Sequence, residues 1–187
     1  MLHNKFYAPF DILNLRWQFY HGIFVHHLLS DIGCYTLGAL SPYKSIHTCV
    51  DMGASITMAK GAADAGIRPA VAVIGDSTFT HSGMTGLLDA VNENTPMTVI
   101  ISDNSTTGMT GGQESSAFAK LEDICIGIGV HPDHVRVVTP LRKNHEDVIK
   151  VLKEEIEYEG VSVVIPRREC IVTVKRSKKE IKQKVKV

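Results

Sequence analysis

The chain has no excess of either charge: among its 187 residues, 20 Lys and Arg balance 20 Asp and Glu, giving a formal net charge of zero. That balance gives no electrostatic basis for binding nucleic acid. No apolar run approaches the roughly 18 residues that a membrane span requires. The four cysteines are scattered, and the sequence shows neither a CxxC pair nor a secretory signal. We therefore expect reduced thiols in a cytoplasmic protein, and no iron–sulfur ligand set of ferredoxin spacing.

What the sequence does contain is enough apolar material for one globular domain of ordinary size, with 44% hydrophobic and 21% charged residues. Residues 1–30 differ from the rest, because they hold seven of the twelve aromatic residues and only one acidic residue, Asp11. Residues 171–187 carry many lysines, which is typical of a solvated, poorly ordered tail. We expect the folded domain to span residues 31–170.

A βαβ unit is predicted in the middle of the chain. Ala70–Ile74 and Met97–Ile101 are short, wholly apolar runs typical of buried parallel strands. Between them, residues 83–94 place apolar side chains three and four positions apart, which predicts a helix. A right-handed crossover puts the two strands side by side, so Asp76 and Asn104, which follow them, should meet at one edge of the sheet.

These two polar side chains predict a divalent-metal and diphosphate site. Carboxylate and amide oxygens are hard ligands, and Mg²⁺ takes about six oxygens in octahedral geometry. We expect Asp76, Asn104 and the main-chain carbonyl of Thr106 to supply three of them. Two diphosphate oxygens and a water would complete the set.

Four strings of residues then point to a family. Gly75-Asp76-Ser77, followed after 25 residues by Asp103-Asn104, resembles the thiamine diphosphate motif of GDG and a later NN. The TGGQ at 110–113 resembles the sequence that follows this motif in 2-oxoacid:ferredoxin oxidoreductases. DIGCYTLG at 31–38 and CVDMGASI at 49–56 are similar to strings of the α subunits of indolepyruvate ferredoxin oxidoreductases. Two positions depart from the motif: Ser77 replaces the last glycine and Asp103 the first asparagine.

The resemblance implies a doubly wound α/β fold with a parallel sheet, the thiamine diphosphate-binding or PP-type fold. It implies thiamine diphosphate and Mg²⁺ as cofactors, and the oxidative decarboxylation of a 2-oxoacid, indolepyruvate or a similar arylpyruvate, to an acyl-CoA. The ferredoxin, the iron–sulfur clusters and the pyrimidine-binding domain with its activating glutamate would come from a partner or a missing domain. We expect the protein to form an oligomer, and we expect this chain to be inactive alone. Two alternatives stay open, a subunit of a non-oxidative thiamine-dependent decarboxylase and a catalytically inactive remnant.

The same resemblance assigns roles to the neighbouring residues. Gly75 and Ser77 would bind the cofactor with Asp76. Met52 lies 24 residues before Asp76, where thiamine enzymes place an apolar side chain that props the cofactor. The competing interpretation is a core methionine at a helix start. Gly53 would let the backbone approach the cofactor, and the helix predicted over Ala54–Ala65 could direct its free N–H groups at a phosphate.

Three further residues have two interpretations each. Cys34 is either a pocket-wall residue, as the resemblance implies, or a small buried apolar residue. His81 either reaches the pocket or caps the helix of residues 83–94. Thr110, with Gln113, either contacts diphosphate or substrate or belongs to a flexible glycine-rich connector.

The alternation of helices and strands continues after this loop. We expect helices over Phe118–Gly129 and Glu146–Tyr158 and strands over Val135–Val138 and Val161–Ile165. Gly22–Leu29 could supply a first strand, within a start that we expect to be replaced or truncated relative to the family. Together these elements predict a parallel sheet of five or six strands.

Overall fold

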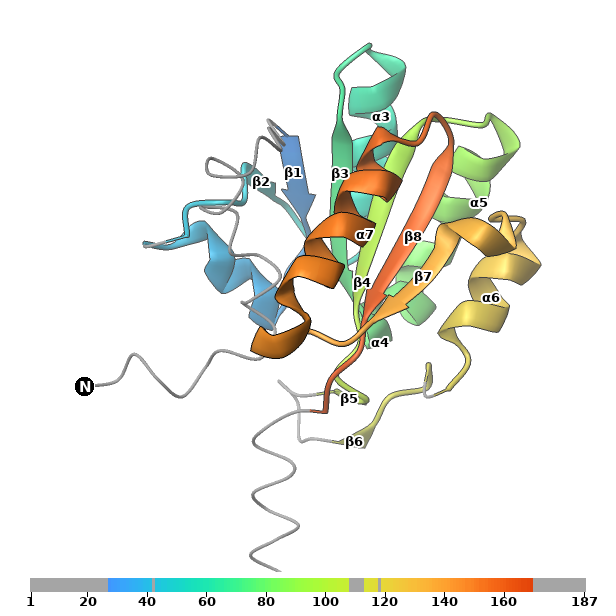
Figure 1. Cartoon of the computed structure of the whole chain (residues 1–187). Coiled ribbons are helices and arrows are strands. Elements are labelled where there is room, and N and C mark those ends of the chain that lie inside the picture. Colours follow the sequence, from blue (N-terminus) through green and yellow to red (C-terminus); the bar gives the residue numbers. More distant parts are fainter. Residues whose placement is uncertain (1–26, 42, 108–112, 118, 170–187) are drawn as a thin grey trace, which may run out of the picture.

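A six-stranded, wholly parallel sheet forms the centre of the protein, in a computed structural model that describes residues 27–41, 43–107, 113–117 and 119–169 (Figure 1). The strand order is β2-β1-β3-β4-β8-β7. The strands are β1 (His27–Ser30), β2 (Thr48–Cys49), β3 (Ala70–Gly75), β4 (Met97–Ser102), β7 (Val135–Val138) and β8 (Val161–Pro166). The sequence order reverses between β1 and β3, which makes the sheet doubly wound. The predicted fold class is confirmed.

Helices cover both faces of this sheet. The helices are α3 (Ala54–Asp64), α4 (Asp76–Thr78), α5 (Met84–Asn92), α6 (Leu121–Ile128) and α7 (His145–Glu157). Apolar side chains of α3, α5 and α6 share one core cluster with β3, β4 and β8, whereas α7 packs against the opposite face. Figure 1 shows α7 in front of the sheet and α3 and α5 behind it. The strands β3, β4 and β8 are buried on both faces, which explains their mainly apolar sequences.

The apolar side chains of the central strand β4 are buried in core clusters on both faces of the sheet. Val99 and Ile101 of β4 are completely buried in the larger cluster, beside Ile56 of α3 and Leu87 of α5. On the other face, Ile100 meets the apolar side of α7. Burying side chains of this size stabilises the fold by about 1.5 to 3 kcal/mol each.

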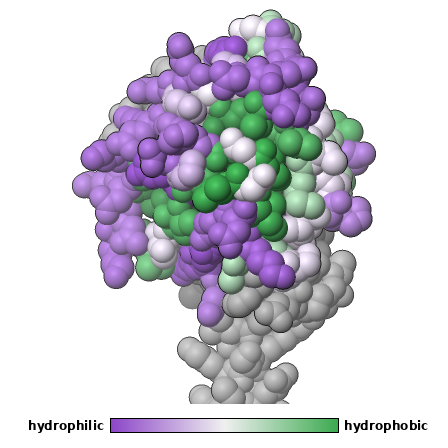
Figure 2. All heavy atoms as spheres, turned by 90° about the vertical axis from the view of Figure 1, so that its right-hand side faces the viewer, coloured by the Kyte–Doolittle hydropathy of each residue, from purple (hydrophilic) through white to green (hydrophobic). Residues whose placement is uncertain are grey.

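The α5–α6 side of the molecule keeps apolar surface in contact with solvent. Figure 2 shows this green area with hydrophilic residues along much of its edge. Met84, Val91, Ile124 and Ile128 are only partly buried against the core there, and Leu88 is 45% exposed. An apolar area with a polar rim is typical of a contact surface.

Two predicted boundaries need correction. Helical structure begins at Asp76 and continues through α4, the π-helical turn η2 (Phe79–Gly83) and α5, so it starts seven residues before the predicted 83. The next helix, α6, starts at Leu121 instead of 118. A π turn inside a helix is often associated with a functional site because it changes the direction of the side chains.

The short elements complete the described chain. A 3₁₀ helix, η1 (Cys34–Ala39), follows β1, and a two-stranded antiparallel pair, β5 (Thr106–Thr107) and β6 (Gln113–Glu114), follows β4. Two further 3₁₀ turns are η3 (Pro132–His134) and η4 (Arg142–Asn144). Of the expected N-terminal segment 1–30, only His27–Ser30 lies within the described residues. The expected tail, 171–187, lies outside them.

Candidate cofactor and metal site

Two of the predicted site residues, Asp76 and Asn104, follow strands that end together at the carboxyl edge of the sheet. Gly75, the last residue of β3, is in register with Ser102, the last residue of β4. Because the two strands end at paired residues, Asp76 and Asp103 follow them at neighbouring positions along the edge of the sheet. Asn104 comes one residue after Asp103. This is the edge at which open α/β sheets bind their ligands.

Asp76 has one carboxylate oxygen in use and one that is not. Its side chain is 3% exposed, and Oδ1 accepts a hydrogen bond from the Ser77 amide at 2.7 Å. Oδ2 is buried and has no hydrogen-bond partner among the described residues. Because a buried carboxylate oxygen is costly to leave unsatisfied, this atom fits a cation at the position that the sequence predicts.

Burial changes the acidity of this group. Removal from water raises the pKa of Asp76 to about 6, and the negative charge of Asp103 beside it adds to the increase. The Ser77 amide acts in the opposite direction by stabilising the carboxylate. A bound cation would favour the ionised form, so metal binding and ionisation of Asp76 are coupled.

Asn104 presents an amide oxygen that already has one donor. Its Oδ1 accepts a hydrogen bond from the Thr106 amide at 3.0 Å, the pattern of an Asx turn. A carbonyl oxygen has a second lone pair, which is compatible with a metal ligand. Thr106 itself is buried in β5. The expected donor set of one carboxylate, one amide oxygen and one main-chain carbonyl is compatible with these positions.

Asp103, which replaces an asparagine of the motif, is held by an arginine. Its Oδ2 accepts a hydrogen bond from Arg167 Nε at 2.6 Å, and its Oδ1 accepts one from the Ser105 amide at 3.0 Å. Arg167 also donates from both terminal nitrogens to Glu122 of α6, at 2.8 and 2.6 Å. The sequence shows Arg167 only as an arginine before a basic tail. In the structure it neutralises the buried carboxylate next to Asp76.

Hydroxyl groups accommodate the other departure from the motif. Ser77 Oγ donates to Ser115 Oγ at 3.1 Å, and Thr80 Oγ1 lies 3.1 Å from Ser116 Oγ. These contacts join the start of the helix after β3 to the segment after β6. The sequence analysis missed Ser115 and Ser116, since nothing in the local pattern of these serines indicates a partner almost forty residues away.

Met52 is not a core residue. Its side chain is 57% exposed in the turn before α3, so the competing core interpretation is wrong and its contact with a cofactor stays a prediction. Gly53 has φ +94°, and a Cβ there would lie 2.2 Å from Ser82 Oγ. Only glycine fits this turn without strain. The Gly53 amide donates to Asp31 Oδ2 at 2.9 Å, so that N–H is used within the protein.

The remaining candidates lie around this edge. Cys34 is exposed on η1, which excludes the small buried apolar interpretation. His81 is exposed within η2, in the middle of continuous helical structure, so there is no helix start for it to cap. Thr110 falls outside the described residues, and of Gln113 only the backbone, in β6, is described. Contacts of Cys34, His81 and Thr110 with cofactor or substrate stay predictions.

The described residues contain no group of three or more His, Cys, Asp or Glu side chains placed to hold a metal ion. A magnesium site here would therefore depend on one carboxylate together with neutral oxygens and the diphosphate. None of the described helices has the length and apolarity to cross a membrane.

The fold defines a class of protein: doubly wound α/β domains, which bind their ligands at the carboxyl ends of the strands where the strand order reverses. Comparison with known proteins then gives the family. The pattern described as "Thiamine pyrophosphate enzyme, C-terminal TPP binding domain" matches residues 31–165. The chain belongs to this family.

The relatives are subunits of indolepyruvate oxidoreductases. The chain is 38% identical over 163 residues to indolepyruvate oxidoreductase subunit IorA of Archaeoglobus fulgidus, a match that covers 81% of this chain and 26% of the relative. With IorA of Pyrococcus horikoshii it shares 34% identity, covering 75% of the chain and 25% of the relative. The chain thus spans about a quarter of the length of the curated relatives it matches.

Solved structures share the fold. A 2-oxoglutarate:ferredoxin oxidoreductase from Magnetococcus marinus gives a TM-score of 0.68 at 21% identity, covering 87% of this chain and 62% of that one. A benzoylformate decarboxylase from Polynucleobacter necessarius gives 0.63 at 14% identity, covering 90% and 34%. An oxidative and a non-oxidative enzyme therefore have the same architecture, and the fold does not decide between these chemistries.

Proposed function

We propose that the chain is the thiamine diphosphate- and Mg²⁺-binding component of a 2-oxoacid:ferredoxin oxidoreductase whose substrate is indolepyruvate or a similar arylpyruvate. The observation that carries the cofactor assignment is the buried Oδ2 of Asp76, which has no hydrogen-bond partner among the described residues and lies at the edge of the sheet where the strand before Asn104 also ends. The oxidoreductase assignment is supported by the 38% identity to an indolepyruvate oxidoreductase subunit.

In this proposal each described residue has a limited role. Asp76, Asn104 and the Thr106 carbonyl hold Mg²⁺, and the turn at Gly75 and Ser77 receives the diphosphate. Met52, exposed in the turn before α3, would support the bound cofactor. When bound, thiamine diphosphate supplies the nucleophilic carbon that attacks the 2-oxo group and accepts the electrons that decarboxylation releases.

The remaining requirements point to a partner. Among the described cysteines, Cys125 is buried and its pKa is raised to about 12, chiefly by burial, which makes it a poor thiolate ligand. In this proposal the iron–sulfur clusters, the coenzyme A site and the pyrimidine-binding domain lie on a partner chain or on a further domain, since the chain covers about a quarter of the length of its relatives. The apolar α5–α6 area supports such an assembly as a contact surface.

The test is reconstitution of the full chain with a partner that supplies the pyrimidine-binding domain and the clusters. We expect reduction of ferredoxin or a viologen that requires indolepyruvate, coenzyme A, Mg²⁺ and thiamine diphosphate together. Release of carbon dioxide without an electron acceptor would instead identify the non-oxidative decarboxylase. Absence of any metal-dependent cofactor binding would leave the inactive remnant as the correct interpretation.

Metal binding should depend on pH through Asp76. Because its pKa is raised to about 6, the carboxylate is protonated below that pH and cannot bind a cation without losing the proton. We expect the affinity for Mg²⁺ and thiamine diphosphate to fall about tenfold between pH 7 and pH 5. Calorimetry at both values measures this, after subtraction of the pH dependence of magnesium binding by free thiamine diphosphate. Equal affinity at the two values would rule out a raised pKa at the ligand.

A further inference from the structure

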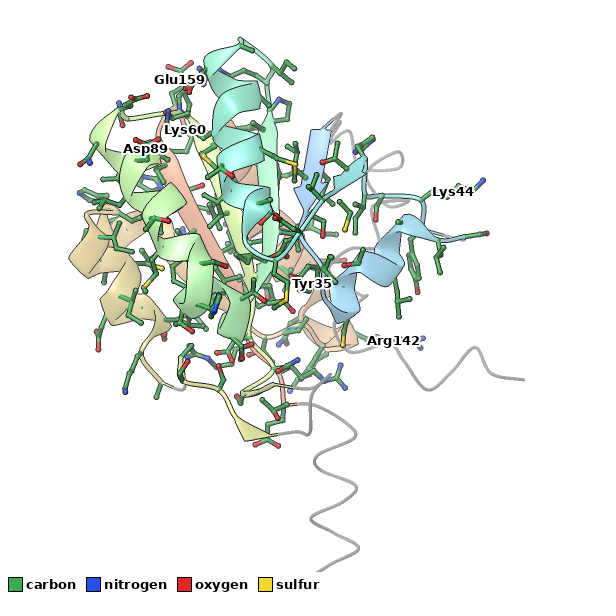
Figure 3. The ribbon with its side chains drawn as sticks, turned by 180° about the vertical axis from the view of Figure 1, so that it is seen from behind. Tyr35, Lys44, Lys60, Asp89, Arg142 and Glu159 are labelled. Carbon is green, nitrogen blue, oxygen red and sulfur yellow. The ribbon has the colours of Figure 1, made fainter. Side chains whose placement is uncertain are left out.

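A buried polar pair, Asp31 and Tyr35, lies beside the proposed metal site. Asp31 directly follows β1 and is completely buried, and Tyr35 is 4% exposed on η1. The Tyr35 hydroxyl donates a hydrogen bond to Asp31 Oδ1. Burial, with the Asp31 charge beside it, raises the pKa of Tyr35 far above its usual value, so the hydroxyl keeps the proton that it donates. Figure 3 shows Tyr35 at the carboxyl end of the sheet, away from Lys60 and Asp89 at the other end.

The Asp31–Tyr35 pair holds the backbone of two separate turns. Asp31 Oδ2 accepts a hydrogen bond from the Gly53 amide at 2.9 Å. The Tyr35 oxygen accepts one from the Gly75 amide at 3.0 Å. Gly53 follows Met52, and Gly75 precedes Asp76. A single pair of side chains therefore connects the turn of the proposed cofactor support to the turn of the proposed metal ligand.

Glycines on both sides make room for the tyrosine ring. A Cβ at Gly33 would lie 2.3 Å from the ring carbon Cε1 of Tyr35, and a Cβ at Gly75 would lie 3.2 Å from the same atom. Thr36 fixes the intervening turn, since its Oγ1 accepts from the Gly33 amide at 2.8 Å and donates to the Asp31 carbonyl at 2.9 Å. The spacing of Asp31, Gly33 and Tyr35 thus has a geometric reason: it builds the pair and the space for it.

We infer that the Asp31–Tyr35 pair positions the cofactor site by fixing the Met52–Gly53 turn relative to the Gly75–Asp76 turn. The inference rests on the proposed function, because its consequence is the affinity for thiamine diphosphate and Mg²⁺. Neither side chain is assigned a contact with the cofactor. Both act through the backbone amides that they hold, so they are positioning residues.

A purely structural role would have a different consequence. Loss of a buried hydrogen bond lowers the stability of the whole domain wherever that bond lies. Loss of a positioning bond also changes the arrangement of the two turns while the domain stays folded. The two roles are separated by comparing cofactor affinity among variants of similar stability.

The test uses Tyr35→Phe and Asp31→Asn in the full 187-residue chain. Tyr35→Phe keeps the ring and removes the oxygen that holds Gly75, and Asp31→Asn keeps the shape of the side chain. The matched control is Ser162→Ala, which removes a completely buried hydroxyl near the start of β8, bonded to Thr98 Oγ1 at 3.1 Å and to the Glu155 carbonyl at 3.0 Å. Thermal unfolding reports the stability of each variant.

Calorimetry with thiamine diphosphate and excess Mg²⁺ supplies the decisive measurement, at a temperature where every variant is folded. We expect Kd to rise at least tenfold in Tyr35→Phe and Asp31→Asn and less than twofold in Ser162→Ala. Hydrogen exchange read at single amides should show loss of protection at Gly75 in Tyr35→Phe, and at Gly53 in Asp31→Asn, with no cofactor present. Magnesium pyrophosphate, titrated in place of the cofactor, should show the same order of affinities among the variants.

Two results would overturn the inference in distinguishable ways. Unchanged affinity in both variants, with the unaltered chain binding the cofactor, would reject the positioning role and leave the proposed function standing. Absence of metal-dependent binding by the unaltered chain would reject the proposed function and this inference with it.

Discussion

Replacing Asp76 with alanine is expected to raise the Kd for Mg²⁺-dependent thiamine diphosphate binding more than a hundredfold, while the domain stays folded. Asp76 is the one carboxylate in the proposed donor set, and its Oδ2 is the buried atom that lacks a partner among the described residues. Without it the site offers Mg²⁺ only neutral oxygens from the protein. A hundredfold change corresponds to about 2.7 kcal/mol, a reasonable cost for the loss of a charged ligand.

Removing the charge of Asp76 should weaken cofactor binding but increase the stability of the cofactor-free domain. A carboxyl group whose pKa is raised in the folded protein contributes stability below its ordinary pKa, near 3.8, and loses it as the pH rises through about 6. At pH 7 the buried, ionised carboxylate of Asp76 therefore lowers the free energy of unfolding of the cofactor-free domain. We expect the free energy of unfolding of Asp76→Asn at pH 7 to exceed that of the unaltered domain by about 1 to 3 kcal/mol, which urea titration measures as a higher midpoint. The same variant should bind no metal.

Opposite effects on binding and stability are typical of a functional residue, because a structural residue loses both together. A suitable control is Asp133→Ala, since Asp133 has an 87% exposed side chain on η3. This variant should change neither the Kd nor the urea midpoint. Wild-type affinity in Asp76→Asn would show that Asp76 is not a metal ligand.

The sequence predicts the centre of this fold well because its strands carry their own signal. Ala70–Gly75 and Met97–Ser102 are apolar at almost every position, since helices cover both faces of the sheet. Pairing of the two strands follows from the βαβ connection, and Asp76 and Asn104 follow from the ends of the strands. The structure confirms that β3 and β4 end together at this edge, whereas the roles of Asp76 and Asn104 as metal ligands stay predictions.

Interactions over long sequence distances were not predictable in the same way. Nothing near Tyr35 indicates that its hydroxyl accepts from the amide of Gly75, forty residues later. The π turn at Phe79–Gly83 hides the true start of the helix after β3, because it shifts the periodicity of the apolar positions there. Likewise, Arg167 looks like part of a basic stretch until the fold brings Asp103 and Glu122 to it.

Arg167→Met is expected to produce the largest loss of stability among these variants. Asp103 is 5% exposed and would remain buried without its cationic partner, and Glu122 would lose both bonds from the same guanidinium. Removing one member of a buried ion pair typically costs about 3 kcal/mol or more, and because the Arg167 side chain is 34% exposed we expect solvent to reduce this loss to about 1.5 to 3 kcal/mol. Urea unfolding should show this loss, whereas Lys150→Met, at a side chain 78% exposed, should stay within about 0.5 kcal/mol of the unaltered chain.

A second substitution tests the reason for that loss. Asp103→Asn places at this position the asparagine found in the motif of the family and removes the buried charge that Arg167 neutralises. In the double variant Arg167→Met with Asp103→Asn, neither charge remains, so we expect most of the stability to return. The two substitutions should therefore couple by about 1.5 kcal/mol or more. Additive losses would show that the ion pair itself does not stabilise this edge of the sheet.

The ion pair also affects the metal site, because the charge of Asp103 contributes to the raised pKa of Asp76. In Arg167→Met the Asp103 carboxylate has no guanidinium beside it and repels the Asp76 carboxylate more strongly. The pH at which metal binding is half-maximal should then move upward in Arg167→Met and return in the double variant. Calorimetry across pH 5 to 8 measures both shifts. Arg167 would in this way account for one of the two departures from the family motif: an aspartate at position 103 is compatible with the metal site because an arginine after β8 compensates its charge.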